Sequence, residues 1–216
     1  MKALKPILAL LGSVVCLGVF FYAPVARGDV SRAESSGPKV GTHPGGIGIS
    51  RTLAPAEGNR LAGFSGGCFW GIEDGFRQVQ GVVATAVGYT GGHVPNPTYE
   101  QVCSHTTGHM ETVLVEFNPK IISYKDLLTF FWKIHDPTTE DRQGPDVGSN
   151  YRSAIWTYGA DEYKEALASR EKRQAKERAR IVTGIHPAAP FYIAEDYHQQ
   201  YDEKTGTHSC PLPRGG

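Results

Sequence analysis

The residues with the clearest potential for chemistry surround a cysteine, in the run GGCFWG (66–71). The glycines predict a turn, and apolar residues recurring at helical spacing from Phe69 to Val79 predict that Cys68 opens a helix. Unpaired N–H groups and the helix dipole favour thiolate over thiol at such a position, and glycines let another molecule approach the sulfur. The pattern predicts a nucleophile, with a buried small hydrophobe as the alternative.

The elements around Cys68 predict an α/β domain of the α+β kind. Strands are expected over 61–65, 82–89, 111–117 and 152–158, and helices over 68–79, 123–135 and 160–180. This βαββαβα order predicts a two-layer sandwich with a split βαβ, ferredoxin-like core and an irregular C-terminal tail. Two long loops, 90–110 and 136–150, are expected to carry site residues, because loops of this length are usually functional.

Composition excludes several classes of protein. The chain has 216 residues, with 22 Lys and Arg against 22 Asp and Glu, so it lacks the uniformly basic surface that most nucleic-acid binders use. Its four cysteines include no C-x-x-C pair, which excludes a zinc ribbon and a thioredoxin-type motif. His105 and His109 have i, i+4 spacing, but Gly108 and the turn-prone residues between them argue against a helix, so no metal site is predicted.

The N-terminus predicts an exported protein, periplasmic or secreted. Lys2 and Lys5 precede 17 uncharged residues, 7–23, and small residues follow, which is the order of a signal peptide. An uncleaved membrane anchor is the alternative, since 17 apolar residues approach the length of a spanning helix. Cleavage near residue 28 would change the net charge from 0 to −3. We expect this segment (1–28), a Gly-, Pro- and Ser-rich linker (29–59) and a catalytic domain (60–216).

Seven motifs resemble those of the A-type peptide methionine sulfoxide reductases, in the order found in that family. They are GCFWGIE (67–73), GYTGG (88–92), NPTYEQVCS (96–104), TGHMETV (107–113), HDPTT (135–139), RQGPDVGSNYRSAI (142–155) and FYIAEDYHQQY (191–201). The resemblance covers about residues 61–210. It implies reduction of the S-epimer of methionine sulfoxide, free or in oxidised proteins, with a thioredoxin-like dithiol as external reductant and no prosthetic cofactor.

By this resemblance Cys68 attacks the sulfoxide sulfur, and Glu111 donates the proton that the departing oxygen requires. Burial beside aromatic residues would raise the pKa of Glu111 toward the protonated form, whereas an exposed strand-end carboxylate is the alternative. Tyr99 and Tyr151 correspond to two tyrosines that hydrogen-bond the sulfoxide oxygen, and Asp146 to a loop carboxylate that orders the site. The alternatives for these three are core tyrosines and a turn-capping aspartate.

Phe69 and Trp70 are expected to form an aromatic cradle for the ε-methyl group of the substrate, with core aromatic residues as the alternative. Attack would leave Cys68 as a sulfenic acid, which a second thiol can condense to a disulfide. Cys210 is the candidate, because the resemblance implies a resolving cysteine in this Gly- and Pro-bearing tail. The tail departs from the family pattern, reading His-Ser-Cys-Pro at 208–211 instead of Gly-Tyr-Cys-Gly.

Other residues have simpler interpretations. Cys103 is expected to be a packing residue, His198 a structural residue on a short C-terminal helix, and the charged run 162–180 a solvated helix face. Two other functions stay open from the residues alone. One is a cysteine hydrolase with Cys68 as nucleophile and His109 or His198 as base. The other is a noncatalytic binding module that carries a thiol.

Overall fold

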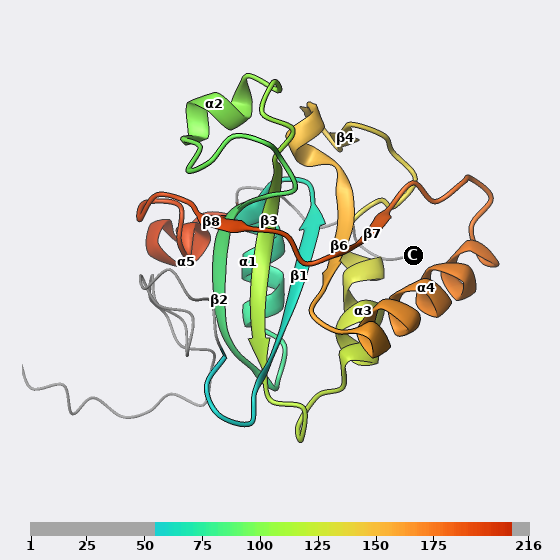
Figure 1. Ribbon diagram of the computed structural model, residues 1–216. Helices are drawn as coiled ribbons and strands as arrows, with labels where there is room; N and C mark the ends of the chain where they lie inside the picture. The colour runs from blue at the N-terminus through green and yellow to red at the C-terminus, as the bar shows by residue number, and fades with distance from the viewer. Residues whose placement is uncertain (1–54, 209–216) are drawn as a thin grey trace, which may run out of the picture. The chain divides into compact units, whose positions relative to one another are not determined.

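The computed structural model describes residues 55–208, which form a six-stranded sheet with helices packed against it (Figure 1). The strands of this sheet are β1 (Arg60–Gly66), β2 (Val82–Thr90), β3 (Met110–Phe117), β6 (Ser153–Thr157), β7 (Gly184–Pro187) and β8 (Phe191–Ile193). The helices are α1 (Phe69–Arg77), α2 (Tyr99–Cys103), α3 (Tyr124–Ile134), α4 (Ala160–Gln174) and α5 (Tyr201–Thr205). Between α3 and β6 lie the ribbon strands β4 (Arg142–Gln143) and β5 (Asp146–Val147) and a 3-10 helix (Ser149–Tyr151). The signal-like segment, most of the linker and Cys210 lie outside the described residues.

The order of the strands confirms the split βαβ arrangement. Across the sheet the strands run β7-β6-β1-β3-β2-β8. Strand β3 lies between β1 and β2, and β1 lies between β3 and β6, so each βαβ unit is split by one inserted strand. Neighbouring strands are antiparallel except for the parallel pair β6 and β7. The outer strands β7 and β8 were not predicted, because each is too short to show a clear alternation of apolar residues.

Helices α1 and α3 lie behind the sheet in Figure 1 and form the main core with it. Ile72 and Phe76 of α1 and Phe131 of α3 are buried because they recur at helical spacing on the face turned to the sheet. The ring of Phe64, from β1, lies 4.6 Å from that of Phe76 and 5.0 Å from that of Phe131. Each such side chain stabilises the fold by about 1.5–3 kcal/mol when buried, so this cluster fixes α1, and Cys68 before it, on the sheet.

The opposite face of the sheet carries a smaller apolar cluster, formed by Leu61, Ala86, Leu114 and Phe191. The connection from β7 to β8 crosses in front of this face (Figure 1). Gly88 of β2 allows β8 to pair closely, since a Cβ there would lie 2.3 Å from the carbonyl oxygen of Tyr192. The C-terminal part of the chain is thereby led to the β2 edge of the sheet, on the side where α5 lies.

Two helices near the C-terminus differ from their predicted extents. The charge pattern predicted a helix over 160–180, but α4 ends at Gln174. The Gln174 amide donates to the carbonyl of Ala179 at 2.9 Å and accepts from the N–H of Ile181 at 2.8 Å, so it closes a turn in place of further helix. His198 was expected on a helix, but it lies in the turn before α5. None of the helices within residues 55–208 is long and apolar enough to cross a membrane.

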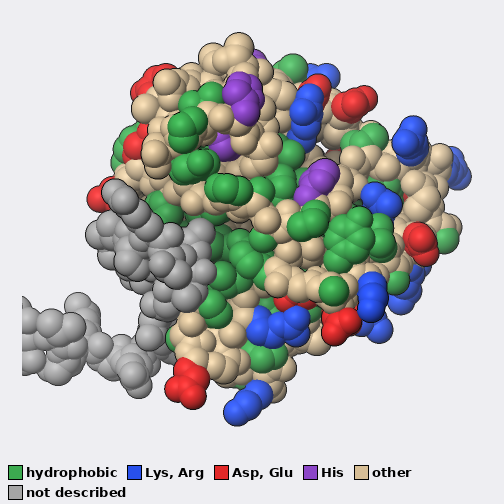
Figure 2. All heavy atoms as spheres, viewed as in Figure 1, with side chains coloured by type: hydrophobic (Ala, Val, Ile, Leu, Met, Phe, Trp, Pro, Cys, Tyr) green, Lys and Arg blue, Asp and Glu red, His purple; other side chains and the backbone are tan. Residues whose placement is uncertain are grey.

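Charged side chains of both signs are interspersed on the face drawn in Figure 2. Helix α4 is exposed along most of its length and buries Glu162 and Ala166, so the prediction of a solvated charged helix is correct for α4 itself. Glu162 accepts a hydrogen bond from the guanidinium of Arg60 at 2.7 Å and thereby joins the first turn of α4 to β1.

Candidate active site

Cys68 stands between β1 and α1, one residue before the helix begins, and its side chain is partly buried. Gly67 precedes it with a φ of +102°, a conformation that glycine adopts without strain. A Cβ on Gly67 would lie 2.5 Å from Cγ of Gln143, so the β4–β5 ribbon packs directly on this turn. A side chain at position 67 would therefore collide with Gln143, which gives a second reason for glycine at this turn.

Glu111 is buried in β3, with 2% of its surface exposed, so the alternative of an exposed strand-end carboxylate is wrong. Its Oε2 accepts a hydrogen bond from the N–H of Phe69 at 3.0 Å, in the first turn of α1. Its Oε1 accepts from Nδ2 of Asn150 at 3.2 Å. Burial raises the pKa of Glu111 to about 8, although these two hydrogen bonds act in the opposite direction. The carboxyl therefore keeps its proton at neutral pH and can give that proton up.

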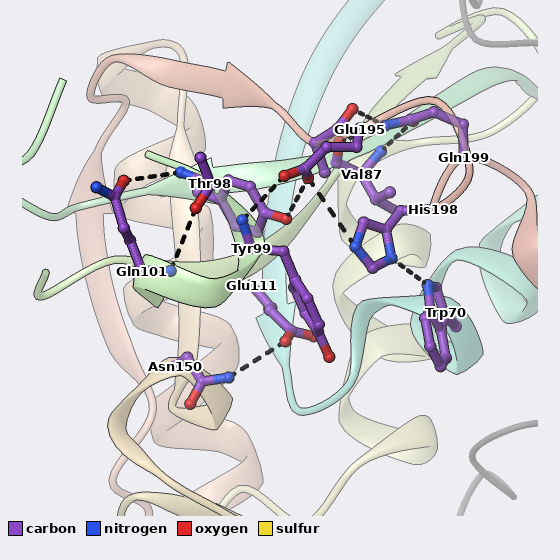
Figure 3. A network of polar contacts seen from close by, with 12 residues as sticks. Trp70, Val87, Thr98, Tyr99, Gln101, Glu111, Asn150, Glu195, His198 and Gln199 are labelled. Carbon is purple, nitrogen blue, oxygen red and sulfur yellow. Dashed lines mark hydrogen bonds and ion pairs between the residues drawn. The ribbon is translucent and has the colours of Figure 1, made fainter. Parts of the chain in front are cut away.

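Tyr99 begins α2, within the first long loop, and Tyr151 ends the 3-10 helix that closes the second. Both are half-buried near Glu111. Figure 3 shows Tyr99 and Asn150 next to the Glu111 carboxyl. Burial raises the pKa of both phenols, and the Glu111 carboxyl raises each further. Both hydroxyls are consequently neutral hydrogen-bond donors across the physiological range. Cys103, at the end of α2, is partly buried, and the Glu111 carboxyl helps to raise the pKa of its thiol, although burial is the larger cause. Cys103 therefore lies near the site.

Asp146 lies in β5, on the ribbon that packs against the turn before Cys68. The side chain of Gln143 accepts from the N–H of Asp136 at 2.9 Å and donates to its carbonyl at 3.1 Å, so the ribbon is tied to the end of α3. From this position the Asp146 carboxylate raises the pKa of Glu111. The ribbon therefore brings a second carboxyl group near enough to the acid to act on it electrostatically.

Phe69 and Trp70 lead α1 away from Cys68 and form an aromatic wall. Phe69 is buried in the core, and Trp70 is half-buried and packs against it. The indole of Trp70 stacks on Tyr201 with ring centroids 3.9 Å apart and 11° between the planes. Its Nε1 donates to Nδ1 of His198 at 3.0 Å. Tyr201 and His198, both from the C-terminal segment, therefore fix the orientation of the Trp70 indole.

Glu195 joins that C-terminal segment to the loop that carries Tyr99, and the sequence did not reveal it. Its Oε1 accepts from the N–H of Tyr99 at 2.9 Å (Figure 3). Its Oε2 accepts from the hydroxyl of Tyr89 at 2.9 Å. Nε2 of His198 lies 3.9 Å from the same Oε2. Helix α2 is only five residues long, so this clamp and the capping box of Thr98 and Gln101 are what fix it in place.

The two histidines considered as bases both contact other groups of the chain. Nδ1 of His109 accepts from the N–H of Gly92 at 3.1 Å, and its Nε2 donates to the carbonyl of Val94 at 2.7 Å. Nδ1 of His198 accepts from Trp70, and its Nε2 points to Glu195. Both ring nitrogens of His109 are engaged in hydrogen bonds, so His109 is not available as the base of a cysteine hydrolase. The ring of His198 is held between Trp70 and Glu195, although its Nε2 makes no hydrogen bond within the described residues. No group of three or more His, Cys, Asp or Glu side chains able to hold a metal occurs within residues 55–208.

The chain beyond Glu195 is fastened to α1 by hydrogen bonds to the buried Glu73 and by an ion pair of Arg77. Glu73 accepts from Oγ1 of Thr85 at 2.8 Å and from the backbone N–H and side-chain amide of Gln200 at 2.8 and 3.0 Å. The guanidinium of Arg77 contacts the carboxylate of Glu203 at 2.6 Å. Burial raises the pKa of Glu73. Helix α5 is thus anchored next to Trp70, and the tail that continues to Cys210 starts from a fixed point.

The arrangement suits a reaction in which a sulfur attacks and an oxygen leaves, because Glu111 can protonate that oxygen while Tyr99 and Tyr151 stabilise it without charge. Fold and site together therefore define a thiol-dependent reductase with an α+β domain. A model of the family described as peptide methionine sulfoxide reductase matches residues 60–214, and the chain belongs to that family.

Relatives and solved structures agree with this assignment. The chain is 60% identical over 154 residues to the peptide methionine sulfoxide reductase MsrA of Methanosarcina acetivorans, covering 70% of this chain and 82% of that protein. It is similar to Mxr1 from Saccharomyces cerevisiae in reduced form, with a TM-score of 0.68, 36% identity, and coverage of 73% and 91% of the two chains. Mxr1 in complex with Trx2 matches with a TM-score of 0.52 and 27% identity, covering 76% and 94%.

Proposed function

We propose that this chain reduces the S-epimer of methionine sulfoxide, in oxidised proteins or as the free amino acid, to methionine. Membership of the peptide methionine sulfoxide reductase family supports the reaction. The observation that carries the assignment of the acid is the buried Glu111 carboxyl, hydrogen-bonded to the first turn of the helix that Cys68 precedes. An enzyme of this class acts in the repair of oxidised proteins.

The chemistry has one redox step at the sulfoxide. Cys68 sulfur attacks the sulfoxide sulfur, a proton from Glu111 passes to the sulfoxide oxygen, and Tyr99 and Tyr151 donate hydrogen bonds to that oxygen. A sulfur–sulfur bond forms as the S–O bond of the substrate breaks and the oxygen leaves as water. Water then adds to the Cys68 sulfur while the sulfur–sulfur bond breaks, so that methionine is released and Cys68 carries an oxygen as a sulfenic acid. The sulfoxide sulfur is reduced by two electrons and the Cys68 sulfur is oxidised by two. Trp70, which is half-buried, receives the ε-methyl group with the buried ring of Phe69 packed behind it, and this apolar wall thereby selects one epimer.

The test of this function uses the full chain, dithiothreitol and the two epimers of a methyl sulfoxide supplied separately. We expect release of the thioether from the S-epimer only. Equal turnover of both epimers would contradict the stereochemical part of the proposal. Absence of any thioether would leave the noncatalytic binding module as the better interpretation.

We propose that Cys210 resolves the sulfenic acid. Its thiol would displace the oxygen as water and form a disulfide with Cys68, which a thioredoxin-like dithiol then reduces by thiol–disulfide exchange. No prosthetic group is needed, because the external dithiol supplies both electrons. The complex of the similar protein Mxr1 with Trx2 supports a partner of this kind. Anchoring of α5 through Glu73 and Arg77 supports a tail that starts close to α1.

The Cys210→Ser variant is expected to convert about one equivalent of sulfoxide per enzyme, because that step needs only Cys68 and the acid. Turnover with thioredoxin should then collapse, since thioredoxin attacks disulfides. A small dithiol reaches the sulfenic acid directly, so both reductants are compared, and Cys103→Ser is the control. If Cys210→Ser turns over normally with thioredoxin while Cys103→Ser loses its turnover, Cys103 is the resolving residue.

We also propose that the mature enzyme works outside the cytoplasm. The support is the N-terminal sequence, with two lysines before an uncharged run of 17 residues and a linker after it. Cell fractionation should place the active protein in the periplasm or the medium, at a mass without residues 1–28. Full-length protein in the membrane fraction would favour the anchor, and active cytoplasmic protein with an intact N-terminus would contradict export.

A further inference from the structure

Asn150 is a buried residue of the site with no assigned role. It lies on the 3-10 helix directly before Tyr151, and none of its surface is exposed. Its Nδ2 donates to Oε1 of Glu111 at 3.2 Å (Figure 3). Its Oδ1 is buried and has no hydrogen-bond partner within the described part of the chain. Because a buried polar atom without a partner is costly, the orientation that directs the N–H groups to Glu111 needs an explanation.

In both of its hydrogen bonds the Glu111 carboxyl is the acceptor. A backbone N–H such as that of Phe69 can only donate, and Asn150 presents its donor side as well. Donors stabilise a carboxylate more than a carboxylic acid, because the bond is stronger when the acceptor carries the charge. The pair is therefore suited to the state of Glu111 after it has lost its proton.

We propose that Asn150 is a positioning residue for the acid step, whose amide N–H stabilises the carboxylate that Glu111 becomes when it protonates the sulfoxide oxygen. In that step the O–H bond of Glu111 breaks, the proton joins the oxygen, and the electron pair stays on the carboxyl group. The inference rests on the proposed function, since it requires Glu111 to be the acid. The proposal also explains why Oδ1 of Asn150 has no hydrogen-bond partner, because the orientation that directs Nδ2 to Glu111 leaves Oδ1 without one.

Several other ionisable groups face Glu111. They are Asp146 on the ribbon, Tyr99 and Cys103 on α2, Tyr151 on the 3-10 helix and Tyr89 on β2. Cys68 is the neighbour of Phe69, whose N–H donates to Glu111. Asp146 opposes ionisation of Glu111, and the tyrosines stay neutral because burial raises their pKa values. Asn150 thus offsets part of the effect that burial and Asp146 have on the acid.

The experiment replaces Asn150 by two residues with different hydrogen-bonding ability. Asn150→Leu removes the donor, and the nearly isosteric Asn150→Asp replaces it with an acceptor and a second charge. The pKa of Glu111 is read directly, from the ¹³C chemical shift of its carboxyl carbon in the full chain, and again from the alkaline limb of the single-turnover rate. We expect a rise of about one pH unit for Asn150→Leu and a larger rise for Asn150→Asp. The single-turnover rate below the limb should fall in both.

The matched control is Ser149→Ala, on the same 3-10 helix, because Ser149 contacts the carbonyl of His105 and not Glu111. Its titration should coincide with that of the unsubstituted protein. A slower reaction with an unmoved pKa in both Asn150 variants would mean that Asn150 is only a packing residue, and would overturn the inference. The ¹³C titration does not depend on catalysis. A Glu111→Gln variant that kept its full rate would instead remove Glu111 as the acid, which is a separate result.

Discussion

Cys68→Ser is expected to abolish sulfoxide reduction while the protein keeps its fold. A serine hydroxyl is a far weaker nucleophile than a cysteine thiol, and it cannot form the sulfenic acid. The loss should be roughly 10³-fold or more in the single-turnover rate. The fold should persist because residue 68 precedes α1 at the N-cap position, where serine is favoured. The measurement is thioether released per enzyme after mixing with the S-epimer.

The matched control for this variant is Cys103→Ser, which removes the other cysteine within residues 55–208. Serine is close in size to cysteine, and Cys103 takes no part in the attack on the sulfoxide, so a stoichiometry near one thioether per enzyme should be kept. Circular dichroism and thermal unfolding of both variants exclude a folding defect as the cause of any loss. Activity of Cys68→Ser within about tenfold of the unsubstituted protein would contradict the assignment of Cys68 as the nucleophile.

The sequence predicted the central fold because its signals are local. The apolar spacing of α1 and α3 and the β-branched runs of β2 and β3 each reflect one buried face, and their order yields the split βαβ sheet. The end of α4 was missed, because the side chain of Gln174 replaces further helix with a turn. The end of this helix depends on the hydrogen bonds of a single side chain, which do not change the spacing of apolar residues in the sequence.

Interactions between distant parts of the chain could not be predicted in the same way. Glu195 clamps the Tyr99 backbone across 96 positions of sequence, and Gln200 donates to Glu73 across 127. Asn150 and Glu111 are 39 positions apart. Motifs identified the residue types near the chemistry, but the clamps follow from the path of the C-terminal segment over the sheet. The one available signal for Asn150 was its place immediately before Tyr151 in the motif at 142–155.

Glu111→Gln is expected to slow the reduction step by roughly 10²–10⁴, the usual effect of losing a general acid. Glutamine is nearly isosteric, and its carbonyl can still accept from the N–H of Phe69, so α1 and Cys68 should stay in place. The substitution removes the proton and little else. Rapid-mixing measurements of thioether formation give the rate, and alkylation of Cys68 shows whether the thiol is still reactive.

The pH dependence separates an acid from a merely structural carboxyl. With its pKa raised to about 8, Glu111 is protonated below that pH and loses its proton above it, so the single-turnover rate of the unsubstituted protein should fall on the alkaline side. Glu111→Gln has no proton to lose, and its low rate should show no such limb. Glu116→Gln is the control, because Glu116 is buried on the same strand and instead accepts from Ala56 and Asn59. An alkaline limb that persists in Glu111→Gln would report the titration of another group. Glu111 would then have a structural role in the site and would not be the proton donor.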